Sequence, residues 1–161
     1  MSHNPHDCQY CQGTNCIFHG PYACGCSSAQ RHTLQPRPSF HEYYTEMAKL
    51  VAKRATCIRR RVGAVVVRDN RVLATGYNGS PPGMGHCIDP DIGCLMEDGH
   101  CVRTVHAEVN AIATAARFGI SVDGADVYVT WEPCRSCRNI LLSAGIKTVH
   151  FSDGPNGPEQ R

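Results

Sequence analysis

Two short motifs in the second half of the chain have the residue types and the spacing of a catalytic metal site. They are His106-Ala107-Glu108 and Pro133-Cys134-Arg135-Ser136-Cys137. One histidine and two cysteines can bind zinc and leave its fourth tetrahedral position open for water, whereas a structural zinc site is usually closed by four protein ligands. Glu108 is then free to move protons, because it is not needed as a ligand. The alternative is a structural zinc, but neither motif has a fourth ligand nearby.

Together the motifs read H-x-E … P-C-x-x-C, the signature of zinc-dependent nucleobase deaminases. Zinc lowers the pKa of its bound water to about 7, which makes hydroxide available at neutral pH. We expect this hydroxide to attack the ring carbon that carries the amine, while Glu108 delivers protons to the ring nitrogen and to the departing amine. The predicted zinc ligands are His106, Cys134 and Cys137, and the predicted catalytic residue is Glu108.

The elements around these motifs must place both of them where a helix begins. Residues 105–118 are rich in alanine and are followed by Gly119, and residues 134–144 are also followed by a glycine, as is typical of helix C-termini. The two cysteines are three residues apart and share one face of a first turn, where the helix dipole favours thiolates. His106 and Glu108 would point about 200° apart on a regular helix, so they converge only at a helix end.

The remaining pattern predicts an α/β fold. Ser39 with Glu42 fits a capping box ahead of an amphipathic helix. Strands are predicted at residues 62–67, 72–77, 125–130 and 146–151, the first of them buried on both faces. The order α-β-β-α-β-α-β implies a central mixed sheet with helices on its faces, a three-layer α-β-α arrangement. Its β-α-β units would bring the two helix N-termini to one sheet edge. Residues 78–101 are predicted to form a functional or metal-braced loop.

Size and charge restrict the classes of partner. The 161 residues suit one domain with an appendage, predicted as a Cys-rich extension and linker over residues 1–38 and a globular domain over residues 39–161. A net charge of +2 and a pI near 8.0 do not favour nucleic acid as a partner. The chain has no apolar run of membrane-spanning length and no apolar secretory stretch at its start, so we expect a cytoplasmic protein without a membrane partner.

The cysteine content predicts further metal sites. Eleven cysteines and nine histidines in a reducing compartment favour metal binding over disulfides. The N-terminal segment has six candidate ligands for one structural zinc: Cys8, Cys11, Cys16, His19, Cys24 and Cys26. The middle of the chain has six candidates for another: Cys57, Cys87, Cys94, Cys101, His86 and His100. The alternatives are an oxidisable tail without metal and a set of buried free thiols, respectively.

From about Phe40 to Phe151 the chain resembles the deoxycytidylate (dCMP) deaminases, especially the type found as late-competence operon proteins. The segments that carry the resemblance are Val62-Gly63-Ala64, Gly76 to Pro81, His86-Cys87, Gly93-Cys94-Leu95, His100 to Ile112 and Pro133 to Cys137. The resemblance implies a cytidine-deaminase-like fold and hydrolysis of dCMP to dUMP and ammonia, which supplies thymidylate synthesis. It also implies homo-oligomers, often hexamers, and control by dCTP as activator and dTTP as inhibitor, with Mg²⁺ accompanying the triphosphate.

Several residues are candidates for substrate contacts. By the resemblance Asn78 would contact the sugar, although Asn-Gly is also a common turn. Trp131 could line a base pocket or belong to the core, and Arg103 could bind phosphate or pair with an acid; Ala107 lies inside the first motif. The run 59–61 of three arginines is either solvated charge or a phosphate contact. Two alternatives to a dCMP deaminase remain: a deaminase of another nucleoside, nucleotide or tRNA base, and an inactive zinc-binding module.

Overall fold

The computed structural model describes residues 36–152, which lie almost entirely in the second of two compact units, Pro38–Arg161. The predicted N-terminal zinc ligands lie outside the described residues. The elements in chain order are α1 (Phe40–Ala52), β1 (Gly63–Arg68), β2 (Arg71–Tyr77), β3 (Met96–Glu97), β4 (His100–Cys101), α2 (Ala107–Arg117), β5 (Asp126–Val129), α3 (Arg135–Ser143) and β6 (Thr148–Phe151). No helix in this part of the chain has the length and apolar character needed to cross a membrane.

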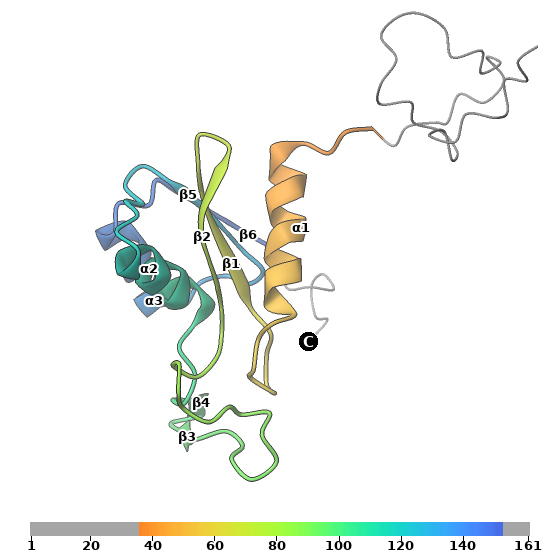
Figure 1. Cartoon of the computed structure of the whole chain (residues 1–161), viewed down its shortest axis with the longest axis vertical. Coiled ribbons are helices and arrows are strands. Elements are labelled where there is room, and N and C mark those ends of the chain that lie inside the picture. Colours follow the sequence, from red (N-terminus) through yellow and green to blue (C-terminus); the bar gives the residue numbers. More distant parts are fainter. Residues whose placement is uncertain (1–35, 153–161) are drawn as a thin grey trace, which may run out of the picture. The chain divides into compact units, whose positions relative to one another are not determined.

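Four of the strands form one mixed sheet in the order β2-β1-β5-β6 (Figure 1). Strand β1 is antiparallel to both β2 and β5, and β5 is parallel to β6, so β2, β5 and β6 run in the same direction. Helix α2 connects β2 to β5, and α3 connects β5 to β6. The predicted mixed α/β sheet and the order of its strands and connecting helices are therefore confirmed; the short strands β3 and β4 were not predicted.

The sheet is covered on both faces, which gives three layers. Helix α1 lies on one face and helices α2 and α3 lie on the other (Figure 1). Because side chains alternate along a strand, β1 supplies Val65 and Val67 to the core under α1, and Ala64 and Val66 to the larger core under α2 and α3. Burial on both faces explains why this strand is an unbroken apolar run in the sequence.

Two glycines allow helices to approach the sheet unusually closely. A Cβ atom on Gly76 of β2 would overlap the backbone of Ala107 and Ala111 in α2. A Cβ atom on Gly63 of β1 would likewise overlap the backbone of Ala48 and Ala52 in α1. Gly76 therefore sets the distance between the sheet and the start of α2, where His106 and Glu108 lie.

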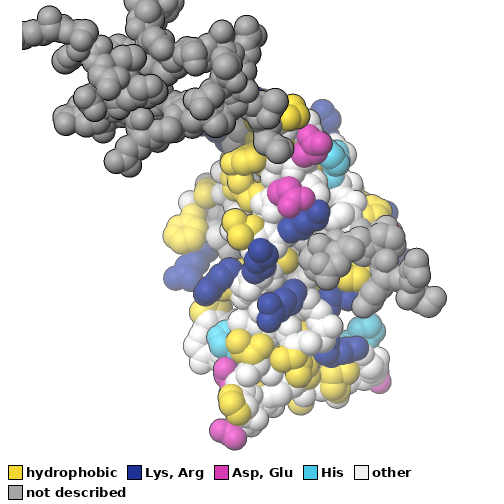
Figure 2. All heavy atoms as spheres, turned by 90° about the vertical axis from the view of Figure 1, so that its right-hand side faces the viewer, with side chains coloured by type: hydrophobic (Ala, Val, Ile, Leu, Met, Phe, Trp, Pro, Cys, Tyr) yellow, Lys and Arg dark blue, Asp and Glu magenta, His cyan; other side chains and the backbone are white. Residues whose placement is uncertain are grey.

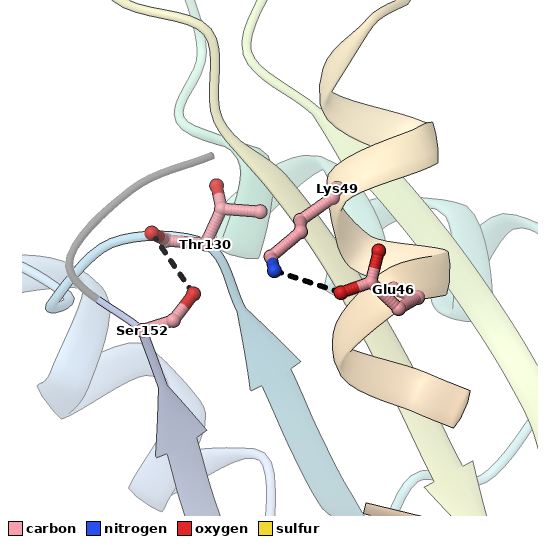
Figure 3. Close-up of polar contacts among 4 residues, drawn as sticks. All are labelled: Glu46, Lys49, Thr130 and Ser152. Atoms are coloured by element: carbon pink, nitrogen blue, oxygen red, sulfur yellow. Dashed lines mark hydrogen bonds and ion pairs between the residues drawn. The ribbon is translucent and has the colours of Figure 1, made fainter. Parts of the chain in front are cut away.

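Helix α1 begins with the capping box that the sequence predicts. Ser39 Oγ accepts a hydrogen bond from the Glu42 backbone N–H at 3.2 Å, and the Glu42 carboxylate accepts one from the Ser39 N–H at 2.7 Å. Further along, Lys49 pairs with Glu46 at 2.8 Å on the exposed side, where ion pairs contribute little to stability (Figure 3). Lys and Arg side chains and apolar patches share this face of the molecule (Figure 2).

The ends of the central strands are tied together beside the second motif. Thr130, which follows β5, is fully buried, and its Oγ1 accepts a hydrogen bond from the Gly63 N–H at 3.1 Å. Ser152, which follows β6, donates from its hydroxyl to the Thr130 carbonyl at 3.5 Å (Figure 3). These bonds hold the end of β5, from which the chain leads directly into Trp131 and the Cys134 motif.

The segment between β2 and α2 contains a small hairpin that the sequence interpretation treated as loop. Strands β3 and β4 pair in antiparallel fashion through Met96 with Cys101 and Glu97 with His100. The two turn residues, Asp98 and Gly99, both have positive φ angles of 45° and 76°. This is the geometry that Asp-Gly favours in tight hairpins, so the sequence did contain the signal.

Candidate functional site

The structure brings three of the predicted zinc ligands together at the start of two helices. His106 is the N-cap residue of α2, Cys134 is the N-cap residue of α3, and Cys137 lies in the first turn of α3. His106 Nδ1 lies 3.7 Å from Cys134 Sγ and 3.3 Å from Cys137 Sγ. We call this set the helix cluster.

Backbone hydrogen bonds place His106 at this point. The chain before it is anchored by two bonds between Gly79 and Val105, in a short antiparallel bridge. Inside α2, Asn110 donates from its side chain to the Tyr77 carbonyl at 2.7 Å, which ties the first turns of the helix to the end of β2. At the start of α3 the Cys137 N–H points to Cys134 Sγ at 3.5 Å, so the sulfur caps the helix.

The geometry of the helix cluster fits tetrahedral zinc. With Zn–S near 2.3 Å and Zn–N near 2.0–2.1 Å, neighbouring ligand atoms at tetrahedral angles lie about 3.6 Å apart. The two nitrogen–sulfur distances of 3.3 and 3.7 Å bracket this value. His106 and Cys134 are exposed while Cys137 is buried, so the ligands are reachable from solvent on one side. Three protein ligands with an accessible fourth side is the pattern of a catalytic zinc.

The surroundings of Cys137 in the helix cluster disfavour its thiolate unless a cation is bound. Burial raises the pKa of the Cys137 thiol above its ordinary value, and the neighbouring Glu108 carboxylate raises it further. Both effects favour the protonated thiol when no metal is bound. A bound metal ion would favour the thiolate instead, because it replaces the thiol proton and offsets the negative charges of the Cys137 thiolate and the Glu108 carboxylate.

Glu108 lies in the first turn of α2, two residues after His106, as the helix-end argument required. Its side chain is 4% exposed and lines a cavity of about 350 Å³. That volume lies within the range of small-molecule sites. The lining residues are Cys57, Arg59, Arg60, Val62, Asn78, Gly99, His100, Cys101, Thr104, His106, Ala107, Glu108, Trp131, Glu132 and Cys134. A nearly buried carboxylate that lines a cavity beside three candidate metal ligands can move protons to a bound ligand.

A second set of cysteines comes together in the segment before α2. The sulfur atoms of Cys87, Cys94 and Cys101 all lie within 4.8 Å of one another, and the Cys87 and Cys101 sulfurs are 3.6 Å apart. Two thiolates on one tetrahedral zinc would lie about 3.8 Å apart, so this set also fits the metal. We call it the loop cluster.

The thiols of the loop cluster differ in their ionisation. Burial raises the pKa of Cys87 to about 12. Burial acts in the same direction on Cys101, but hydrogen bonds from the backbone of Arg103 and Leu95 and from the neighbouring thiols prevail and lower its pKa to about 7. Cys101 is therefore the thiol of the loop cluster whose surroundings most favour loss of its proton.

The other candidates for the second metal lie outside the loop cluster. Cys57 is buried and lines the cavity, and it is close enough to Cys94 to act on it electrostatically. His86 has a buried Nδ1 without a hydrogen-bond partner among the described residues, whereas the His100 side chain is exposed and lines the cavity.

The predicted substrate contacts are placed in three different ways. Ala107 and Trp131 line the cavity. Asn78 lines it too, but its amide already holds the backbone of the preceding loop: Oδ1 accepts from the Val62 N–H and Nδ2 donates to the Arg60 carbonyl, both at 2.8 Å. One Nδ2 hydrogen and one lone pair of Oδ1 are left for a ligand. Arg103 is not among the lining residues and donates to the Gly93 carbonyl at 3.1 Å, which braces the loop.

Sequence reasoning gave too little weight to Arg59 and Arg60 and did not single out Thr104, all of which line the cavity. The guanidinium carbon of Arg60 lies 4.2 Å from the centre of the Trp131 ring. The two residues are 71 positions apart, so no local pattern could have paired them.

Comparisons with known proteins agree with this geometry. Residues 38–153 match the model of the cytidine and deoxycytidylate deaminase zinc-binding region. The chain is 50% identical over 117 residues to ComE operon protein 2 of Bacillus subtilis, an alignment that covers 73% of this chain and 61% of that protein. It is 38% identical over 124 residues to the deoxycytidylate deaminase of Mycobacterium phage D29, covering 71% of this chain and 95% of the phage protein.

A solved structure has the same architecture. The dCMP deaminase of cyanophage S-TIM5 in complex with dCMP and dUMP superposes with a TM-score of 0.62 at 34% identity, covering 73% of this chain and 84% of that one. The chain spans only part of some relatives: 61% of the Bacillus protein and 39% of the deoxycytidylate deaminase of Schizosaccharomyces pombe. With most of its length matched by the family model, the chain belongs to the cytidine and deoxycytidylate deaminase family.

Proposed function

We propose that this protein is a zinc-dependent deaminase that hydrolyses dCMP to dUMP and ammonia. The observation that carries the proposal is the single cavity that joins His106 and Cys134 of the helix cluster to the nearly buried Glu108. Relatives named deoxycytidylate deaminase, and a cyanophage relative whose structure contains dCMP and dUMP, support the choice of substrate. Production of dUMP would supply thymidylate synthesis.

His106, Cys134 and Cys137 would hold the zinc ion. The ion would lower the pKa of a bound water to about 7. Glu108 would take a proton from the attacking water and pass protons to the ring nitrogen and to the exocyclic amine. The water oxygen becomes the new carbonyl oxygen, the carbon–nitrogen bond breaks, and the amine leaves as ammonia. Ala107, completely buried beside Glu108, would form part of the cavity wall.

We propose a second, structural zinc on the loop cluster. Cys87, Cys94 and Cys101 supply three ligands, and the fourth comes from Cys57, His86 or His100. Cys57 is the first choice because it is buried and acts on Cys94 electrostatically. A metal here would fix the long segment between β2 and α2, which has few regular backbone hydrogen bonds of its own. A third zinc would be held by four of the six N-terminal candidates: Cys8, Cys11 and Cys24, completed by Cys16, His19 or Cys26.

Further properties are proposed from the family. The protein would act in the cytoplasm, where thiol ligands remain reduced. It would form homo-oligomers, and dCTP and dTTP, accompanied by Mg²⁺, would raise and lower its affinity for dCMP. The effect of each nucleotide would be measured as a shift of the half-saturating dCMP concentration.

The deciding experiment measures ammonia release from the zinc-loaded full chain with dCMP, deoxycytidine, cytidine and adenosine side by side. We expect dCMP to be the preferred substrate and Glu108→Gln to abolish most of its turnover. Faster turnover of another base would favour a different deaminase. Zinc binding without turnover of any of the four would favour the inactive zinc-binding module.

A further inference from the structure

The thiols of the loop cluster differ in how a small molecule can reach them. Cys101 is partly exposed and lines the cavity that contains Glu108, whereas Cys87 is only 2% exposed and does not line it. The sulfur atoms of these two cysteines lie 3.6 Å apart, and the Cys94 sulfur lies within 4.8 Å of both. A small molecule in the cavity therefore meets Cys101 first, and the buried Cys87 sulfur lies next to it.

The backbone allows these two sulfurs to approach each other. A disulfide bond is about 2.05 Å long, so the sulfurs must close a gap of about 1.5 Å. Cys87 lies in a turn over residues 86–89, which is closed by hydrogen bonds between Asp89 and His86, and Cys101 lies in the hairpin of β3 and β4. Within residues 36–152 no backbone–backbone hydrogen bond joins this turn to the hairpin. The turn can therefore move toward the hairpin while both keep their own hydrogen bonds.

We propose that Cys87 and Cys101 form a reversible disulfide, which makes the loop cluster an oxidation site that controls the wall of the deaminase cavity. With hydrogen peroxide as oxidant, the Cys101 sulfur bonds to one peroxide oxygen, the oxygen–oxygen bond breaks and water leaves with the thiol proton. The Cys87 sulfur then attacks the sulfenic sulfur, the sulfur–oxygen bond breaks, and the hydroxyl leaves as a second water with the Cys87 proton. The two thiols lose two electrons, and the peroxide is reduced to two waters.

The disulfide and a metal on the loop cluster exclude each other. Zinc binds cysteine as the thiolate, and the disulfide removes two of the three thiols that converge here. Cys94 alone would remain, which is too few ligands for a structural zinc. Oxidation should therefore release the proposed second zinc, and reduction should restore the site.

Oxidation should also change the cavity. Gly99, His100 and Cys101 are consecutive residues of the hairpin, and all three line the cavity that contains Glu108. A disulfide that draws Cys101 toward Cys87 displaces this part of the wall, so turnover should fall. The inference rests on the proposed function only in this effect on turnover, because disulfide formation itself does not depend on the reaction.

The deciding experiment treats the reduced, zinc-loaded full chain with hydrogen peroxide. Remaining thiols are alkylated, and cross-linked peptides are identified by mass spectrometry. We expect the Cys87–Cys101 cross-link as the main product and its reversal by dithiothreitol. Cross-links between other cysteines alone, or oxidation of Cys101 to the sulfinic acid without a cross-link, would overturn the proposal.

Three variants separate the disulfide from metal binding. Cys87→Ser, Cys94→Ser and Cys101→Ser each remove one candidate zinc ligand, so a role in metal binding alone affects all three alike. The disulfide needs only the pair whose sulfurs lie 3.6 Å apart, so Cys94→Ser is the matched control and should still form the cross-link. Loss of the Cys87–Cys101 cross-link in Cys94→Ser would contradict direct pairing of the two thiols.

Turnover of dCMP and zinc release are followed in the same samples of wild-type protein. Turnover should fall several-fold in proportion to the Cys87–Cys101 cross-link, and one zinc per chain should pass to a chelating dye. Dithiothreitol with added zinc should restore both. A loss of turnover that instead follows oxidation of Cys134 or Cys137, or a cross-link without any loss of turnover, would overturn the control of the cavity.

Failure of this inference can be separated from failure of the proposed function. If the Cys87–Cys101 cross-link forms reversibly but the reduced protein hydrolyses no cytosine substrate, the proposed reaction is wrong and the oxidation site stands. If the reduced protein hydrolyses dCMP and no such cross-link forms, the reaction stands and the loop cluster is not an oxidation site.

Discussion

The helix cluster and the loop cluster are built from similar ligand atoms but are held by different parts of the fold. In the helix cluster, His106 and Cys134 are N-cap residues of helices that pack on the central sheet. In the loop cluster, Cys87 lies in a segment without helices or strands, and Cys101 lies in a hairpin strand of two residues. The sheet and its helices hold the residues of the helix cluster in position, whereas little regular secondary structure holds the residues of the loop cluster.

This difference indicates separate roles for the two proposed metals. Helices α2 and α3 position the backbone of the helix cluster, so we assign the proposed metal there to chemistry. The loop cluster holds three thiols close together in an irregular segment, and metal binding would convert that proximity into stability. The clusters are nevertheless coupled in space, because Cys101 of the loop cluster lines the cavity that contains Glu108.

The largest effect is expected from removing a ligand of the helix cluster. Cys137→Ser should lose one zinc per chain and essentially all turnover, because a hydroxyl is a poor replacement for a thiolate on zinc. The fold should persist, since β1 and the cores on both sides do not depend on this sulfur. Zinc content by atomic emission, turnover of dCMP and circular dichroism check the three statements. Retained turnover after full loss of one zinc would assign catalysis to a different metal.

A slightly smaller effect should follow from removing the proton carrier while keeping the ligands. Glu108→Gln should lower kcat by about 10²- to 10⁴-fold and leave the zinc content unchanged, because the carboxylate moves protons and is not a ligand. The amide is nearly isosteric with the carboxylate, so it also preserves the packing of this nearly buried side chain. If zinc content fell together with kcat, Glu108 would be a ligand or a structural residue and not a proton carrier.

Substitutions in the loop cluster should lower the stability of the protein more than its turnover. Cys94→Ser and Cys101→Ser should each lose one zinc per chain relative to wild type and lower the Tm by several degrees. Turnover should fall only partly, through loosening of the cavity wall, because neither sulfur touches the reacting atoms. Cys57→Ser tests the fourth ligand in the same way. Unchanged zinc content in all three variants would mean that these are free thiols, as the alternative reading of the sequence allowed.

The contrast between the clusters also explains how much the sequence could predict. The capping box at Ser39, the buried strand β1 and the helix starts at His106 and Cys134 follow from local patterns, and the element order follows from them. Residues at helix ends are restricted by backbone geometry, so their spacing carries three-dimensional information. This is why the convergence of His106, Cys134 and Cys137 could be predicted from their positions in the sequence.

Residues in the irregular segment carry no such restriction. Five of the six candidates for the second metal lie there, and only the folded chain shows that Cys87, Cys94 and Cys101 converge. The stacking of Arg60 on Trp131 depends equally on long-range packing. The hairpin at Asp98 and Gly99 is different, because its turn signal was visible but was overlooked in a segment rich in turn residues.

A backbone substitution should act on the helix cluster and spare the loop cluster. Gly76→Ala places a Cβ against the backbone of Ala107 and Ala111, so α2 must shift away from β2. We expect a loss of about 1–3 kcal/mol in stability and a larger loss of turnover than the destabilisation alone explains, because His106 and Glu108 move with the helix. Gly63→Ala crowds α1 in the same manner and is the matched control. Equal losses of turnover in the two variants would show that overall stability, and not the position of α2, limits activity.

The smallest effect is expected where neither cluster is involved. Ser39→Ala removes the side-chain cap of α1, which packs on the face of the sheet opposite α2 and α3 (Figure 1). The loss of one cap should lower the free energy of unfolding by about 1 kcal/mol, and Ser39→Thr, which keeps the hydroxyl, should restore most of it. Zinc content, kcat and KM should remain at wild-type values. The sheet separates α1 from α2 and α3, and the proposed zinc ligands of the helix cluster lie at the starts of α2 and α3. Denaturant unfolding of the zinc-loaded protein and steady-state kinetics check both parts. A change in KM would show that α1 affects the cavity through the loop that carries Arg59 and Arg60. Substrate binding would then depend more on that loop than on the loop cluster.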